Sequence, residues 1–146
     1  MLKEILSRTE LIERLNAPEH PRCYPPGSDR ARWARLLDSP VRRAWAEEYL
    51  RAARQLKDRH GGEPLYPQLS AADALAFIRN GNRVDYEAGY FLRRSRLSLF
   101  TMAECISWSG EFLPEIIEGI WQLLGELYWA LPAHCSYLPG DPMPRR

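Results

Sequence analysis

FLPEIIEGIWQLLGELYW, residues 112–129, carries the clearest structural signal in the chain. Its polar residues recur at spacings of three, four and four, the period of an α-helix: Glu115, Glu118, Gln122 and Glu126. The apolar residues between them are expected to be buried: Leu113, Ile116, Ile117, Ile120, Trp121, Leu124, Leu127 and Tyr128. We therefore predict an amphipathic helix over residues 112–129 that packs through a wide apolar face.

Helical spacing also extends upstream, and no segment has the pattern of a strand. Helices are expected at 3–15, after Ser28, from Pro40 to about Gly61, from Ser70 to about Arg79 and from Arg83 to about Trp108. Their expected starts and turns carry typical residues: Ser39 before Pro40, Ser70 three residues before Asp73, and the turn Asn80–Gly81–Asn82. We predict one all-α domain over 1–146, with about five helices packed as antiparallel hairpins.

Composition and charge exclude several classes of protein. The chain has 146 residues, 45% of them hydrophobic and 27% charged, as in ordinary globular proteins. Its net charge of +1 creates no overall field for nucleic acid or an anionic membrane, so neither partner is expected. Arginines on the first helices alternate with acids, which favours solvated ion pairs. The chain has no transmembrane run or signal-peptide pattern, so as written it is predicted to be cytoplasmic, although a removed signal peptide would leave no trace.

Cysteine and histidine positions give no catalytic or metal pattern. The three cysteines, Cys23, Cys105 and Cys135, are odd in number and widely separated, so free thiols are expected. His134 adjoins Cys135, but adjacent side chains on an extended segment point apart and make a poor nucleophile–base pair. His20 and Cys23 do not combine with them in a recognised zinc spacing. We therefore predict no catalytic residue, no metal site and no cofactor.

The arginine-rich segment before and within the 83–108 helix is the first candidate site. Arg93 and Arg94 precede an apolar run in which Glu104 is the single acid, and a buried carboxylate needs a cationic partner. One interpretation is a structural ion pair of Arg94 with Glu104 that locks two helices. The alternative is an anion site, in which Arg79, Arg83 or Arg94 offers a planar fork to a carboxylate or sulfate.

The proline-rich stretch WALPAHCSYLPGDP, residues 129–142, is the second candidate site. Loops held by a rigid scaffold often carry binding groups. Trp129 and Tyr137 can stack on sugar rings or simply be buried, and His134 can hydrogen-bond a polysaccharide or remain a solvent-exposed histidine. Trp108 and Trp121 are expected in the core.

Ordered motifs in the second half of the chain resemble heparinase II/III-like proteins. The motifs are Asn82, Arg83, Tyr86 and Glu87; Arg93 and Arg94; Ala103 and Glu104; and Trp129 with Pro132, Ala133 and His134. The resemblance covers roughly residues 75–146. Leu127 departs from the pattern, because a small hydroxyl residue is expected at that position. The group includes polysaccharide lyases whose helical part is an (α/α) toroid.

The resemblance implies that the chain is an N-terminal helical fragment of a longer lyase. A toroid of about twelve helices needs well over 200 residues at the usual helix and loop lengths. The family reaction is β-elimination on uronic-acid-containing polysaccharide, and its main catalytic tyrosine and histidine are expected in the missing parts. This chain would be inactive alone and contribute groups that bind an acidic polysaccharide or oligosaccharide: Arg79, Asn82, Arg83, Trp129, His134 and Tyr137.

A second hypothesis makes no use of the resemblance. The apolar face of the 112–129 helix would serve a non-catalytic interaction module that binds a protein partner or itself. Its partner would then be a second copy in a homodimer, whereas the first hypothesis predicts contact with the remainder of the parent chain.

Overall fold

The computed structural model describes residues 7, 9, 10, 13, 25–59, 64–126 and 129–134. Within these residues the chain forms α-helices, one short 3-10 turn and no strand: α2 (Arg30–Leu36), α3 (Pro40–Asp58), α4 (Ala71–Asn80), α5 (Val84–Ser107), α6 (Leu113–Leu124) and η1 (Pro132–His134). The predicted all-α class is confirmed. The helix predicted at 3–15 lies largely outside the described residues.

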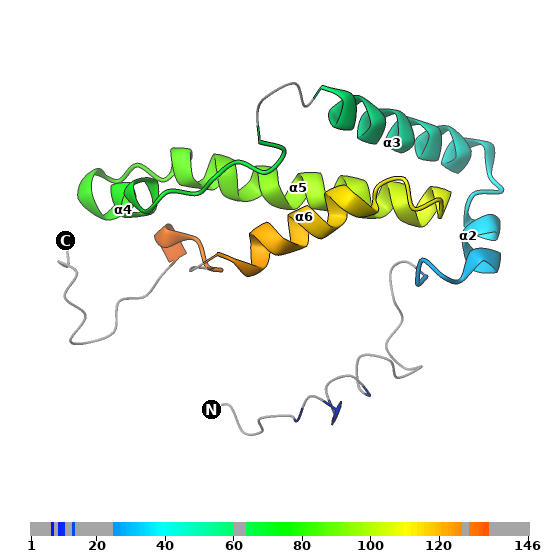
Figure 1. The fold of residues 1–146 in the computed structure, drawn as a ribbon, viewed down its shortest axis with the longest axis horizontal. Coiled ribbons are helices and arrows are strands. Elements are labelled where there is room, and N and C mark those ends of the chain that lie inside the picture. The colour runs from blue at the N-terminus through cyan, green and yellow to red at the C-terminus, as the bar shows by residue number, and fades with distance from the viewer. Residues whose placement is uncertain are drawn as a thin grey trace.

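The longest helix, α5, is the axis of the fold. Figure 1 shows α3 and α6 lying along it, and these two helices make the most extensive contacts with α5. α6 returns antiparallel to α5 after a tight turn. The short helices occupy opposite ends, with α2 near the last turn of α5 and α4 near its first turn.

Local signals placed most helix ends correctly. Ser70 caps α4 because its hydroxyl accepts a hydrogen bond from the Asp73 amide at 3.0 Å. Gly81 ends the same helix with φ of 80°, a left-handed conformation that glycine adopts without strain. α2 begins after Ser28, as predicted, and its cap is Asp29, whose side chain accepts a hydrogen bond from the Arg32 amide. α6 ends at Leu124, before Gly125, so the helix predicted to 129 is too long.

The core has two adjoining clusters. One contains Ala53, Leu65, Tyr66, Phe100, Ala103 and Phe112. The other contains Trp33, Ala46 and Ile106. Tyr66 belongs to the segment between α3 and α4, and its hydroxyl donates to the Glu115 carbonyl oxygen at 2.8 Å. This bond fastens the connecting segment to α6, where Gly119 leaves room for the ring: a Cβ there would lie 2.5 Å from the Tyr66 oxygen.

The apolar face predicted for the last helix is largely uncovered, and that prediction was wrong. Ile116 packs against the core. Five other residues are 46–74% exposed: Leu113, Ile117, Ile120, Trp121 and Leu124. Leu127 and Tyr128 lie outside the described residues. Helical periodicity marks which side chains share a face, but burial also requires an opposing surface, and the described residues supply none for these five. We call these five residues the α6 stripe.

The last turn of α5 is held by an arginine from far upstream. Arg30 donates to the carbonyl oxygens of Cys105 and Ile106 at 2.7 and 2.9 Å. Its guanidinium also lies 5.5 Å from the centroid of the Trp108 ring. Carbonyls at a helix C-terminus lack partners and carry partial negative charge, so a cation there is favourable. Trp108 is half exposed, contrary to its predicted place in the core.

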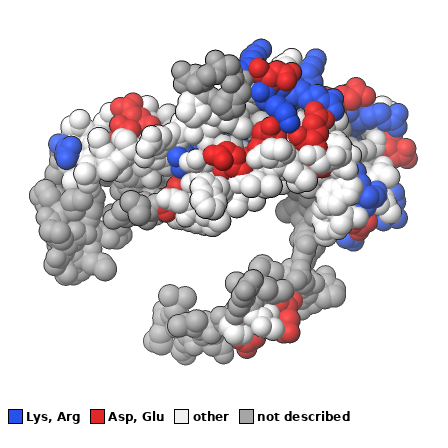
Figure 2. Space-filling model, in the orientation of Figure 1, with Lys and Arg blue, Asp and Glu red and all other residues white. Residues whose placement is uncertain are grey.

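Charge is unevenly distributed over the molecule. Figure 2 shows Lys and Arg gathered with acidic residues over α2 and α3, while the surface over α6 is mostly uncharged. Exposed pairs of Arg32 with Asp29 at 3.8 Å and of Arg43 with Asp38 at 3.9 Å fit the predicted solvated ion pairs. Arg54 on α3 also forms a bidentate pair with Glu111, in the turn before α6, at 2.8 and 2.9 Å. None of the described helices is long and apolar enough to cross a membrane.

Candidate functional site

The described helix-end and turn residues predicted to bind substrate gather at one end of α5. η1, which contains His134, packs against α4. Arg79 lies in the last turn of α4, and Asn82 and Arg83 follow in the turn that leads into α5. Figure 1 shows this turn and η1 at the same end of the long helix. Two segments about fifty residues apart in sequence are thus brought close together.

Asn82 and Arg83 make local contacts at the start of α5. The Asn82 side chain accepts from the Val84 amide at 3.0 Å and donates to the Asp85 carboxylate at 2.8 Å. Arg83 donates to Glu87 one turn later at 2.7 Å. Both residues therefore organise the helix start, and a ligand would have to compete with Glu87 for the Arg83 guanidinium.

The residues after α6 are more open. Trp129 is 63% exposed, and its carbonyl oxygen accepts a hydrogen bond from the Tyr90 hydroxyl at 2.8 Å. That bond fixes the backbone of Trp129 against α5 and leaves the indole accessible. His134 is exposed. Tyr137, the remaining predicted binding residue, lies outside the described residues, as do His20, Cys23 and Cys135.

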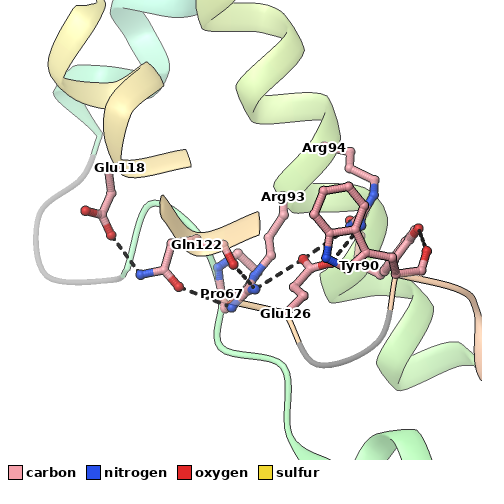
Figure 3. A network of polar contacts seen from close by, with 8 residues as sticks. Pro67, Tyr90, Arg93, Arg94, Glu118, Gln122 and Glu126 are labelled. Atoms are coloured by element: carbon pink, nitrogen blue, oxygen red, sulfur yellow. Dashed lines mark hydrogen bonds and ion pairs between the residues drawn. The ribbon is translucent and has the colours of Figure 1, made fainter. Parts of the chain in front are cut away.

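A buried charge cluster joins α5 to the residues after α6. The Glu126 carboxylate is 2% exposed and pairs with Arg93 at 3.2 Å and Arg94 at 2.7 Å. Arg94 also lies over the Tyr90 ring, 3.2 Å from its centroid. Figure 3 shows the two guanidinium groups converging on Glu126. Two cations facing one carboxylate leave one positive charge in excess.

Arg93 extends this cluster to a third segment. It is 5% exposed, and its Nε donates to the Pro67 carbonyl oxygen at 2.6 Å. Its Nη1 donates to the Gln122 carbonyl oxygen at 3.3 Å, and its Nη2 to the Gln122 side-chain oxygen at 3.4 Å. Arg93 therefore links the segment before α4, the middle of α5 and the end of α6.

The ion pair predicted between Arg94 and Glu104 was wrong. Ten residues along one helix separate two positions by about 15 Å, beyond the reach of a direct pair. Glu104 is buried, as expected, but accepts hydrogen bonds from the amides of Gly110 at 2.6 Å and Phe112 at 3.1 Å. Backbone N–H groups of the α5–α6 turn therefore satisfy the carboxylate, and the ion pair that locks two helices has Glu126 as its acid.

A cavity of about 460 Å³ opens beside the charge cluster, between α4, α5 and α6. Its polar lining residues are Gln68, Ser70, Tyr86, Arg93, Gln122 and Glu126. Its apolar lining comes from Leu69, Ala71, Ala74, Leu75, Trp121 and Gly125. Binding sites for small ligands commonly have this size and this mixture of apolar walls with a few polar groups. We call it the α4–α6 cavity.

Tyr86 lines this cavity and is a candidate hydrogen-bond donor to a ligand. Burial raises the pKa of Tyr86, and the negative charge of Glu126 adds to the shift, so the phenol stays protonated at neutral pH. Within 25–59, 64–126 and 129–134, no hydrogen bond engages this hydroxyl. A ligand oxygen can therefore accept from it.

Sequence reasoning did not assign this cavity. Arg93 appeared only as half of an arginine pair, and Trp121 was expected in the core, whereas it is 74% exposed at the cavity wall. Gln68 lies in a linker with no distinguishing pattern. The sequence signal for this region is the group of three arginines at positions 93, 94 and 96. Such a group indicates a charge cluster but does not locate a cavity.

The Ser70 hydroxyl donates to the Asp73 carboxylate at 2.6 Å, and both side chains belong to the cap at the start of α4. The thiol of Cys105 lies beneath α2, and burial raises its pKa, which disfavours the reactive thiolate. A comparison of the sequence with protein-family models and with curated proteins found no match. The polar and aromatic side chains around the α4–α6 cavity are therefore the candidate binding groups of the chain.

Proposed function

We propose that the chain is the N-terminal helical part of a heparinase II/III-like polysaccharide lyase, and that it binds acidic saccharide without cleaving it. In the lyase reaction a cation or donor neutralises the uronate carboxylate, a base removes the neighbouring C5 proton and an acid protonates the leaving oxygen. This chain offers the first of these groups, in its arginines. The base and the acid would come from the remainder of the parent chain.

One observation carries the proposal: residues that bear the resemblance also hold the α5–α6 unit together. Arg93 and Arg94 clamp the end of α6 through Glu126. Glu104 fixes the turn between the helices, and the carbonyl of Trp129 is tied to α5. Motifs spread over about fifty residues therefore have connected structural roles, which supports one shared architecture over a chance coincidence of short matches.

Calorimetric titration with uronic-acid oligosaccharides tests the proposal. The 146-residue chain is titrated with sulfated and unsulfated oligosaccharides, while absorbance of the unsaturated product is followed in parallel. We expect saturable binding and no product, and much weaker binding of neutral oligosaccharides of equal length. Absence of binding to every acidic saccharide would refute the saccharide-binding role. Formation of product would refute the non-catalytic role.

The α6 stripe favours a second candidate function, a helical module that associates with a second copy of itself. The stripe residues recur at spacings of four, three, one and three, so they form one continuous helix face. An uncovered apolar face of this kind is typical of an interaction surface. Light scattering over a concentration series tests it: we expect a dimer that Ile117→Lys converts to a monomer. A wild-type chain that stays monomeric throughout would exclude self-association.

A further inference from the structure

We propose that the α4–α6 cavity seats one uronate ring of the saccharide, with its carboxylate toward Arg93 and its apolar face on Trp121. This inference rests on the proposed function and assigns the saccharide to a site apart from the turn and loop residues predicted from sequence. Arg79, Asn82, Arg83, Trp129 and His134 do not line this cavity.

The cavity is large enough for one ring, and Gln68 and Trp121 in its lining are exposed to solvent. Its volume of about 460 Å³ falls within the range of ligand sites in proteins, roughly 300–1,000 Å³. Gln68 and Trp121 are exposed at its edge, whereas Tyr86 and Arg93 are only 5% exposed. A ligand that entered would therefore meet the exposed Gln68 and Trp121 first and the buried Tyr86 and Arg93 beneath them.

The donor count at Arg93 leaves room for an acceptor. A guanidinium has five N–H groups. Four hydrogen bonds from Arg93 go to Pro67, to the backbone and side chain of Gln122, and to Glu126. Within the described part of the chain, one N–H on Nη2 is left over, and the existing Nη2 bond is long at 3.4 Å. A ligand carboxylate can accept hydrogen bonds from both N–H groups of Nη2, and these charged bonds are stronger than the bond to the Gln122 amide oxygen.

The sign of the local charge selects an anion. The Arg93–Arg94–Glu126 cluster has an excess of one positive charge, and Glu126 is the acidic residue among those that line the cavity. Both oxygens of that carboxylate already accept hydrogen bonds from arginine. An incoming carboxylate therefore meets Glu126, whose charge is neutralised by arginine, and Arg93, which still has an N–H to donate. The Tyr86 hydroxyl adds an uncharged donor that suits a ring oxygen or hydroxyl.

Trp121 provides the apolar surface. Its indole is 74% exposed although it lines the cavity, so a large part of its face is uncovered. Sugar rings present an apolar face of C–H groups that stacks on aromatic rings, while their hydroxyls need polar partners at the edge. The exposed side chain of Gln68 in the cavity lining provides an amide group for such a hydroxyl. A simple inorganic anion would use Arg93 but gain nothing from Trp121.

The test compares three variants of the 146-residue chain by titration with a glucuronate-containing disaccharide. Trp121→Ala is expected to weaken binding about tenfold or more, and Trp121→Phe to restore most of it. Leu124→Ala is the matched control, because Leu124 is 65% exposed in the α6 stripe but does not line the cavity. The methyl ester of the same disaccharide should bind about tenfold more weakly to the wild type.

Failure of this inference is distinguishable from failure of the proposed function. If the wild-type chain binds the disaccharide and Trp121→Ala binds it equally well, the ring is seated elsewhere and the inference is overturned while saccharide binding stands. Equal affinity for the acid and its ester would overturn the role of Arg93. Equal losses in Trp121→Ala and Leu124→Ala would assign the effect to the α6 stripe and not to the cavity. If the wild type binds no saccharide, the proposed function itself fails.

Discussion

Replacing Glu104 with alanine should loosen the turn that reverses the chain between α5 and α6. The substitution removes two hydrogen bonds, at 2.6 Å to the Gly110 amide and 3.1 Å to the Phe112 amide. Hydrogen bonds to charged groups contribute about 1.5–3 kcal/mol each, and a buried amide left without a partner costs about 1–3 kcal/mol. Phe112 is fully buried, so water cannot easily replace the lost acceptor there. We expect the free energy of unfolding to fall by about 3 kcal/mol.

Urea denaturation followed by circular dichroism measures this loss. Glu104→Gln keeps one acceptor oxygen and directs an amide toward the other N–H, so we expect about half of the alanine effect or more. Glu118→Ala is the control, because Glu118 is exposed and, among the residues that the structure describes, its carboxylate accepts a hydrogen bond only from Gln122 one turn away on α6. A loss below about 0.5 kcal/mol for Glu104→Ala, similar to that of a surface substitution, would refute our account of the turn.

Three further predictions concern Tyr66, Gly119 and Trp129. Burial, aided by the charge of Glu115, raises the pKa of Tyr66 to about 12, so its contribution to stability is present below the unfolded pKa near 10 and falls as pH rises toward 12. The free energy of unfolding should therefore fall less steeply between pH 10 and 12 in Tyr66→Phe than in the wild type. Identical pH profiles of the two proteins would contradict this. Gly119→Ala should lower unfolding free energy by about 1–3 kcal/mol in urea titration, because the new Cβ meets the Tyr66 ring; an unchanged midpoint would show that the ring moves aside. Trp129→Ala should leave the affinity for a glucuronate-containing disaccharide unchanged in calorimetry, because Trp129 does not line the α4–α6 cavity; a severalfold loss would place the saccharide at the residues after α6 instead.

Features encoded by neighbouring residues were predictable. The Ser70 cap with Asp73 and the left-handed Gly81 depend on residues within one turn of each other, and the structure has both. The bounds of α5 were predicted to within about one residue, because its apolar positions recur without interruption by proline.

Features that depend on distant partners were not predictable in the same way. Sequence indicated that Glu104 needs a partner, but the choice between a cation and a pair of backbone amides depends on the path of the turn after Trp108. Burial of the α6 stripe was predicted from periodicity alone, which cannot tell whether an opposing surface exists. The α4–α6 cavity joins Gln68, Arg93 and Trp121 from three segments, and no short pattern relates them.

Arg30 has a consequence for how this fold can be divided. It reaches the last carbonyls of α5 across 75 and 76 positions of sequence, and the segment just before it packs on Trp108, where Gly27 would bring a Cβ within 2.5 Å of the ring. A shortened chain that begins at Pro40, the start of α3, would therefore lose contacts that hold the end of α5. Trimming to that point would remove the cap of a helix more than sixty residues away. The guanidinium of Arg30 and the buried indole of Trp33 both tie α2 to the end of α5, so a shortened chain has to keep α2 to keep these contacts.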